Sequence, residues 1–113
     1  MNWKRQQELF KVMVKEEMDL LNKKGAEYAS DADALANFKR QAEAWGVSPL
    51  VVLGIFMDKH YSAVQSYVRK GGKIVSNEPI EGRVNDLRNY AFLLLALIED
   101  LKASEPKNET PSV

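Results

Sequence analysis

The chain has 113 residues, of which 45% are hydrophobic, and its 16 basic and 16 acidic residues give a formal net charge of zero. This length and composition predict one folded domain, and the neutral charge argues against binding of long nucleic acid, which needs a basic excess. With no cysteine and one histidine, the sequence excludes disulfides, cysteine-bound iron–sulfur clusters and zinc sites built from cysteine or from several histidines.

The distribution of apolar residues indicates a soluble protein. The amphipathic start of the chain has no apolar core of the signal-peptide type. The longest apolar run, Ala91–Ile98, is far shorter than the ~20 residues that cross a bilayer. We therefore expect a cytoplasmic protein without a membrane partner.

The first predicted helix covers residues 2 to about 24. Its apolar residues recur at helical spacings of three, four and seven, at Trp3, Phe10, Met13, Val14, Met18 and Leu21. Glu17 lies on the same stripe, where it either reaches water at the edge or points into a polar pocket, because a buried carboxylate without a partner is costly. Lys23 and Lys24 followed by Gly25 form a typical helix end.

Two further helices are marked by their ends. Ser30 and Asp33 have capping-box spacing and predict a helix that reaches Trp45, stopped by Gly46. Its apolar face is Leu35, Phe38, Ala42 and Trp45. Ser48-Pro49 starts the next helix, which runs to about Lys70 before Gly71-Gly72. Its stripe is Leu53, Met57, His60, Val64 and Val68.

A fourth helix opens at Glu78-Pro79, after a short connector at 73–77 with extended potential, and runs to about Lys102. Its apolar positions follow a seven-residue repeat, at Val84, Leu87, Ala91, Leu94, Ile98 and Leu101. Four helices with short connections predict an all-α, four-helix bundle-like domain over residues 1–104, with a disordered polar tail at 105–113. Because the fourth helix is apolar beyond the needs of one packing layer, we expect a homo-oligomer.

Polar residues at the start of the fourth helix are the first candidates for a site. Asp86 and Asn89 are three residues apart and share a helix face, an arrangement that suits an octahedral Mg²⁺ with oxygen ligands. Glu17 or Asp58 would complete such a metal site. The alternative is structural, with Asp86 pairing with Arg83 or capping a neighbouring helix.

The single histidine and the basic and aromatic residues have two interpretations as well. His60 lies on an apolar stripe, where it is either a satisfied core residue or a ligand contact. Basic residues would form a phosphate-binding wall if their helices converge, namely Lys23, Lys24, Lys39, Lys59 and Arg69. Tyr28, Phe38 and Tyr90 offer flat surfaces on which a base could stack. The same residues also describe a solvated rim with core aromatics.

Four short segments resemble a group of small phage proteins. They are Lys24-Gly25-Ala26-Glu27-Tyr28-Ala29, Leu35-Ala36-Asn37-Phe38-Lys39, Lys59-His60 and Asp86-Leu87-Arg88-Asn89-Tyr90. In order and spacing they are similar to MazG-like, all-α nucleoside triphosphate pyrophosphohydrolases and to a nucleotide-modification-associated domain of phages. The resemblance implies a helical oligomer, a nucleotide ligand, Mg²⁺ and, for a phage-encoded protein, the host cytoplasm. The chain departs from MazG-like enzymes because it lacks their E-x-x-E pair and has Arg83 in place of the glutamate of E-x-x-D.

Three functions are consistent with these features. The first is Mg²⁺-dependent hydrolysis of a nucleoside triphosphate, with Asp86 and Glu17 on the metal, Asp58 as a further ligand or base, and Lys24 and Lys59 on phosphates. The second is an anti-defence protein that sequesters a nucleotide or cyclic nucleotide immune signal without catalysis. The third is a helical scaffold without ligand. The predicted ligand contacts are Lys24, Glu27, Tyr28, Asn37, Phe38, Lys59, His60, Asn89 and Tyr90.

Overall fold

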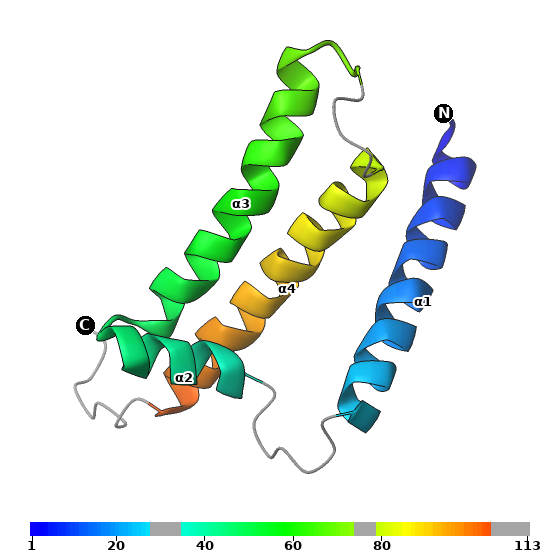
Figure 1. The fold of residues 1–113 in the computed structure, drawn as a ribbon. Helices are drawn as coiled ribbons and strands as arrows, with labels where there is room; N and C mark the ends of the chain where they lie inside the picture. Colours follow the sequence, from blue (N-terminus) through cyan, green and yellow to red (C-terminus); the bar gives the residue numbers. More distant parts are fainter. Residues whose placement is uncertain (28–34, 74–78, 105–113) are drawn as a thin grey trace, which may run out of the picture. The chain divides into compact units, whose positions relative to one another are not determined.

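The structure is a computed structural model that describes residues 1–27, 35–73 and 79–104. Within these ranges it contains four α-helices and no strand, and the prediction of an all-α protein is confirmed. The helices are α1 (Trp3–Glu27), α2 (Ala36–Trp45), α3 (Pro49–Arg69) and α4 (Ile80–Ser104) (Figure 1). The capping-box residues Ser30 and Asp33, the predicted helix start at Glu78, most of the connector at 73–77 and the tail at 105–113 lie outside the described residues.

The chain divides into two compact units, Met1–Asn37 and Phe38–Val113. The boundary falls within the first turn of α2. The predictions of a single domain and of a four-helix bundle concern the placement of one unit against the other, and they stay predictions.

The first unit is dominated by α1, a helix with large apolar side chains on its surface. Trp3, Phe10, Val14 and Met18 are all exposed. The helix continues through Gly25 to Glu27, so the predicted end at Gly25 is wrong. A glycine costs a helix ~1 kcal/mol relative to alanine, which weakens the helix at that point without ending it.

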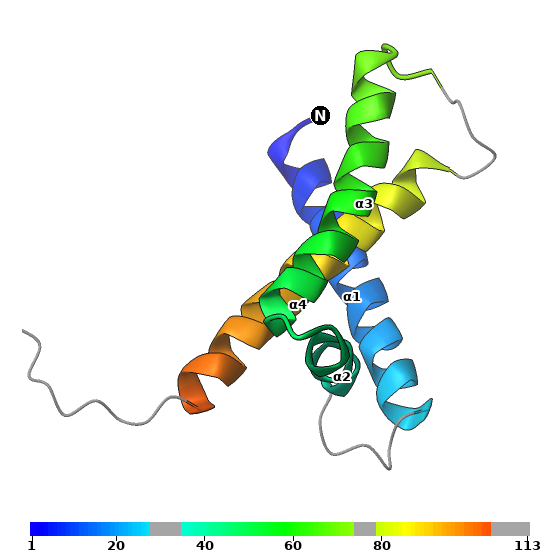
Figure 2. The same ribbon diagram turned by 60° about the vertical axis from the view of Figure 1, so that its left-hand side comes forward.

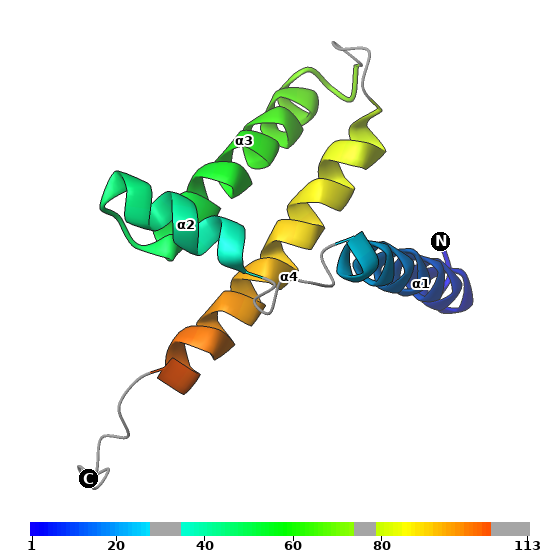
Figure 3. The same cartoon turned by 60° about the horizontal axis from the view of Figure 1, so that its bottom comes forward.

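The second unit is built on α3 and α4, which lie side by side and run in opposite directions. Figure 2 shows the two helices crossing, with α2 nearly end-on beside the start of α3, and Figure 3 shows the same neighbourhood from below. The core of this unit contains Ala42 of α2, Val52 and Leu53 of α3, and Leu97 of α4, all buried. The buried apolar residues of α3 follow its start, and α2 and α4 each contribute one buried side chain to this core.

Both ends of α3 agree with the sequence signals. Ser48 has an extended backbone and its hydroxyl accepts a hydrogen bond from the Leu50 amide at 3.1 Å, with Pro49 in the first turn. Gly71 and Gly72 adopt φ values of 67° and 82°, a region that favours glycine. These local signals fix where α3 begins and ends.

The face that α4 buries differs from the predicted stripe. Leu97 is 0% exposed, whereas the predicted core positions Val84, Ala91 and Ile98 are exposed. From Ala91 to Ile98 α4 is apolar on every side, so its pattern does not select one face; packing against α3 does.

Two other predicted core residues lie at helix ends and are exposed, Trp45 of α2 and Val68 of α3. The apolar stripes of these helices extend beyond the stretch that a partner covers. The remaining stripe residues of α3, Met57 and Val64, are half-buried, as expected beside a single partner helix.

A candidate polar site between α3 and α4

Four rings from three helices form a continuous series, here called the aromatic ladder: Phe38, Phe56, Tyr90 and His60. Phe38 of α2 meets Phe56 of α3 edge-on, with ring centroids 6.1 Å apart. Tyr90 of α4 stacks with Phe56 at 5.8 Å and with His60 at 5.2 Å. The ladder brings together three predicted ligand contacts, Phe38, His60 and Tyr90. Because the Tyr90 ring already stacks with two neighbours, its main role in this structure is to join α4 to α3.

The polar end of the ladder is the His60–Asp86 pair. His60 is buried, and its Nδ1 lies 3.6 Å from Oδ2 of Asp86, whose side chain is 57% exposed. This separation is longer than the usual 2.7–3.2 Å of an N–H···O hydrogen bond, and it forms an ion pair when the imidazole is protonated. The pair connects the buried face of α3 with solvent at the start of α4.

Three buried polar atoms of α3 and α4 have no hydrogen-bond partner among the described residues. They are Nδ1 of His60, Nε of Arg88 and Oδ1 of Asn89. Asn89 lies one turn after Asp86, so the two side chains are neighbours on the surface of α4. We call His60, Asp86 and Asn89 the polar site. Its unpaired atoms are unusual, because buried polar groups are nearly always hydrogen-bonded.

Tyr90 shows the electrostatic character of the same region. Burial, and to a lesser extent the negative charge of Asp86, raises the pKa of the Tyr90 hydroxyl above its usual value. Both causes disfavour a tyrosinate. At neutral pH Tyr90 is therefore an uncharged ring with a hydroxyl that can donate a hydrogen bond.

Other predicted site residues of the second unit lie away from the polar site. Asp58 and Lys59 are exposed on α3, and residues one or two positions from His60 point in other directions on a helix. Lys39 of α2 forms an ion pair with Asp100 of α4, with Nζ and Oδ2 2.6 Å apart. The predicted phosphate-binding role of Lys39 therefore competes with an internal partner.

The first unit holds the rest of the predicted site. Glu17 of α1 is half-buried, and its Oε1 has no hydrogen-bond partner among the described residues; that it points into a polar pocket stays a prediction. Asn37 is exposed at the end of this unit. The side chains of Lys24 and Glu27, and the whole of Tyr28, lie outside the description. A metal site shared by Glu17 and Asp86 would join the two units and stays a prediction.

A metal site made only of histidine, cysteine and carboxylate side chains is not found in the described part of the chain, because no three of them come together. The polar site supplies one imidazole, one carboxylate and one amide oxygen. Mg²⁺ accepts one or two protein oxygens and keeps several waters, so Asp86 and Asn89 fit that ion. Asp58, exposed on another face of α3, does not lie beside them.

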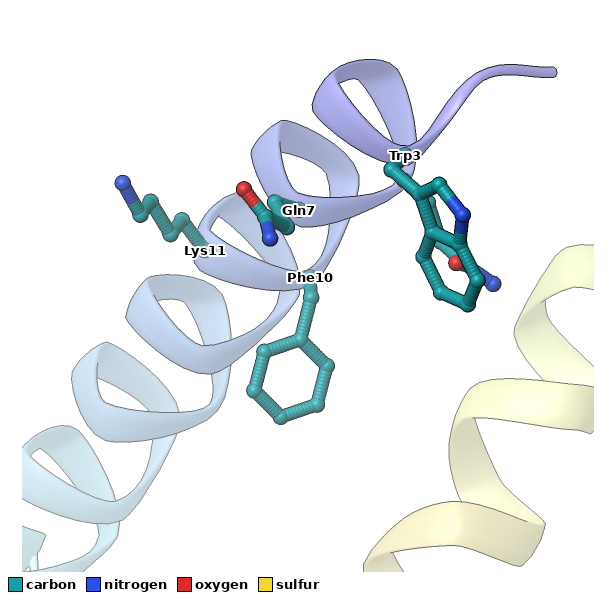
Figure 4. Close-up of a pocket in the computed structure, with 5 residues that line it drawn as sticks. Trp3, Gln7, Phe10 and Lys11 are labelled. Atoms are coloured by element: carbon teal, nitrogen blue, oxygen red, sulfur yellow. The ribbon is translucent and has the colours of Figure 1, made fainter.

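A shallow hollow on α1 contains none of the predicted site residues. It is lined by Trp3, Gln6, Gln7, Phe10 and Lys11, and Figure 4 shows Trp3 and Phe10 projecting from one side of the helix while Lys11 projects from the other.

Among the described helices, none is both long and apolar enough to cross a bilayer.

Two partners were missed by reasoning from the sequence. Phe56 lies four residues before His60, so the helical period places both rings on one face of α3, and that spacing could have identified the ladder. The Lys39–Asp100 pair joins helices far apart in the chain and has no sequence signal.

Comparison of the chain with protein-family models, with curated proteins and with solved structures finds no match.

Proposed function

We propose that this protein binds a nucleotide or cyclic nucleotide at the polar site between α3 and α4. The observation that carries the proposal is the pair of buried atoms without a hydrogen-bond partner, His60 Nδ1, which lies 3.6 Å from the exposed Asp86 carboxylate, and Asn89 Oδ1, whose residue follows Asp86 by one turn of α4. A buried polar atom without a partner costs about 1–3 kcal/mol, and a bound ligand would recover that free energy. The resemblance to MazG-like and nucleotide-modification-associated proteins supplies the class of ligand.

Sequestration is the version of this function that the geometry supports best. Binding needs polar contacts, which the polar site provides, and the Tyr90 hydroxyl beside it can donate a further hydrogen bond. Hydrolysis of a triphosphate would in addition need several carboxylates around metal ions, and the described residues bring one carboxylate to this place. We therefore propose a non-catalytic binder, which could act against host defence by removing a nucleotide signal.

Hydrolysis is the second candidate because Asp86 is accessible and has Asn89 one turn away. Mg²⁺ held by these two oxygens would neutralise phosphate charge next to the Asp86 carboxylate. Under this candidate Asp86 and Asn89 position the ion, and the predicted phosphate contact of Lys59 would have to be made from another face of α3, where Lys59 is exposed.

The proposal includes a MazG-like four-helix arrangement and a homo-oligomer. Support comes from exposed apolar side chains on one face of α4, at Val84, Ala91, Leu95 and Ile98. Their spacing of three or four residues is that of a helix-packing seam. The solution mass of the protein tests this part directly.

The binding test uses a panel of nucleoside triphosphates and cyclic nucleotides, each with and without Mg²⁺. We expect at least one to raise the melting temperature of the wild-type protein and to lose that effect in Asp86→Asn. Glu99→Gln is the matched control, because it neutralises an exposed carboxylate on another face of α4. A panel in which no ligand changes the melting temperature would favour the scaffold interpretation.

Recovery of the ligand separates the two candidates. The bound compound is released by denaturation and analysed by chromatography. A ligand recovered unchanged after long incubation with Mg²⁺ supports sequestration. Release of pyrophosphate that disappears in Asp86→Asn supports hydrolysis and contradicts the non-catalytic proposal.

A further inference from the structure

The geometry of the polar site suits a metal ion better than a direct contact between its side chains. Nδ1 of His60 and Oδ2 of Asp86 are 3.6 Å apart, beyond hydrogen-bond distance. Two ligand atoms on one ion, each bonded at about 2.0–2.1 Å, lie about 2.8–3.0 Å apart in octahedral geometry and about 3.3–3.4 Å apart in tetrahedral geometry. A movement of a few tenths of an ångström would let both atoms bind the same tetrahedral ion.

The third side chain of the site adds an oxygen ligand. Asn89 lies one turn after Asp86, and its buried Oδ1 has no hydrogen-bond donor among the described residues. An amide oxygen can only accept hydrogen bonds or bind a cation. A neutral imidazole also offers an acceptor at Nδ1. The site therefore offers a nitrogen and a carboxylate oxygen 3.6 Å apart, with a buried amide oxygen on the residue one helical turn after Asp86.

We propose that His60, Asp86 and Asn89 bind a divalent transition-metal ion, with Nδ1 of His60 as the nitrogen ligand. The mixed donor set favours ions such as Zn²⁺ or Mn²⁺ over Mg²⁺, because imidazole suits transition metals and Mg²⁺ prefers oxygen. Asp86 is 57% exposed, so the ion can enter from solvent. Three protein ligands leave coordination positions open.

The open positions explain how an anionic ligand could approach a carboxylate. Phosphate oxygens next to Asp86 would be repelled, whereas a bound divalent ion reverses the local charge and can bind phosphate directly. This step rests on the proposed nucleotide function. Metal binding itself does not, and the experiment tests it without any nucleotide.

The single histidine of the chain gives a direct measurement on the wild-type protein. The full-length chain without a histidine tag is titrated with Mn²⁺ at about pH 8, where an ordinary imidazole is neutral, and its imidazole proton signals are followed by NMR. We expect paramagnetic broadening of the His60 signals at low Mn²⁺ concentration, reversed by competition with Zn²⁺. Broadening of other residues while His60 stays sharp would overturn the proposal.

Affinities of variants give a second measurement. Equilibrium dialysis should show the tightest binding for Zn²⁺, weaker binding for Mn²⁺ and the weakest for Mg²⁺. His60→Gln and Asp86→Asn should each weaken Zn²⁺ binding by about tenfold or more. Even the loss of a residue that only hydrogen-bonds to a metal ligand typically lowers metal affinity by about 10–100-fold. Glu99→Gln should bind as the wild type does. Equal affinity of all four proteins, or no Zn²⁺ binding, would contradict the site.

Circular dichroism checks that the variants fold, and if they do not, the NMR titration of the wild type decides. The outcomes are distinct from those of the nucleotide test. Nucleotide binding unaffected by a chelator would refute the role of the metal in binding phosphate and leave the proposed function intact. Metal binding by a protein that no nucleotide stabilises would support the metal site and refute the proposed nucleotide function.

Discussion

Replacement of Leu97 by alanine tests which face of α4 holds the fold together. Leu97 is 0% exposed, and the substitution removes three carbon atoms. At about 0.8 kcal/mol per buried methylene the transfer loss is about 2.4 kcal/mol, and the cavity left behind raises the expected cost to about 3–5 kcal/mol. In a domain of this size each kcal/mol lowers the melting temperature by about 4–8 °C, so we expect a fall of more than about 10 °C.

Leu95→Ala is the matched control, because it makes the same chemical change two residues away on the same helix. Leu95 is 65% exposed, and its loss should change the free energy of unfolding by less than about 0.5 kcal/mol. Both variants are compared by urea denaturation at two protein concentrations. If Leu97→Ala and Leu95→Ala destabilised the protein equally at both protein concentrations, the described orientation of α4 would be refuted. Destabilisation of Leu95→Ala that grows as the protein is concentrated would instead show that oligomerisation covers this face.

Four further substitutions follow from local contacts. Ser48→Ala removes the cap of α3 and should lower the unfolding free energy by about 1 kcal/mol in urea denaturation. Burial and Asp86 raise the pKa of Tyr90 in the folded state, so the folded chain keeps a proton that the unfolded chain releases above about pH 10, and stability falls as pH rises. Tyr90→Phe should reduce this loss of stability. Denaturation at about pH 9 and pH 11 measures the difference. Asp100→Asn breaks the half-exposed pair with Lys39 and should cost at most about 1 kcal/mol, an effect that shrinks in high salt. Asn89→Leu removes a buried unpaired oxygen and should stabilise the ligand-free protein by about 1 kcal/mol while weakening Zn²⁺ binding in dialysis; an unchanged affinity would exclude Asn89 from the metal site.

The ends of α3 could be predicted because their causes lie within a few residues. Ser48 caps the helix through the amide of Leu50, and Gly71 and Gly72 supply the positive φ that ends it. Each signal acts inside one turn of chain, and the sequence contains all of it. Gly25 shows the limit of the same reasoning, since a glycine permits a helix end without requiring one.

The orientation of α4 could not be predicted, because orientation depends on a partner. A helix that is apolar on every side offers several possible stripes, and the heptad positions Val84, Ala91 and Ile98 form a regular one. The structure instead buries Leu97. The position of Tyr90 among the rings of α3 is consistent with this choice, because Tyr90 and Leu97 are seven residues apart and share a face.

The members of the polar site could be identified singly from the sequence, and their pairing could not. Asp86, Asn89 and His60 each attract attention as polar residues near apolar stripes. Whether these residues lie close together depends on how α3 and α4 are aligned along their axes, which no local sequence pattern encodes. The prediction that Asp58 joins Asp86 rested on residue type alone and did not take the alignment of α3 with α4 into account. It also overlooked that Asp58 and His60 point in different directions on α3.

The free-energy cost of the polar site favours binding over a purely structural role. Each unpaired buried polar atom costs about 1–3 kcal/mol, similar to the 1.5–3 kcal/mol gained by burying one large aliphatic side chain. A helical scaffold would be more stable with apolar residues in place of His60 and Asn89, whose buried Nδ1 and Oδ1 have no hydrogen-bond partner among the described residues. A cation or a hydrogen-bonding ligand at Asp86 would satisfy both atoms, so the same feature that weakens the ligand-free fold would strengthen its complex.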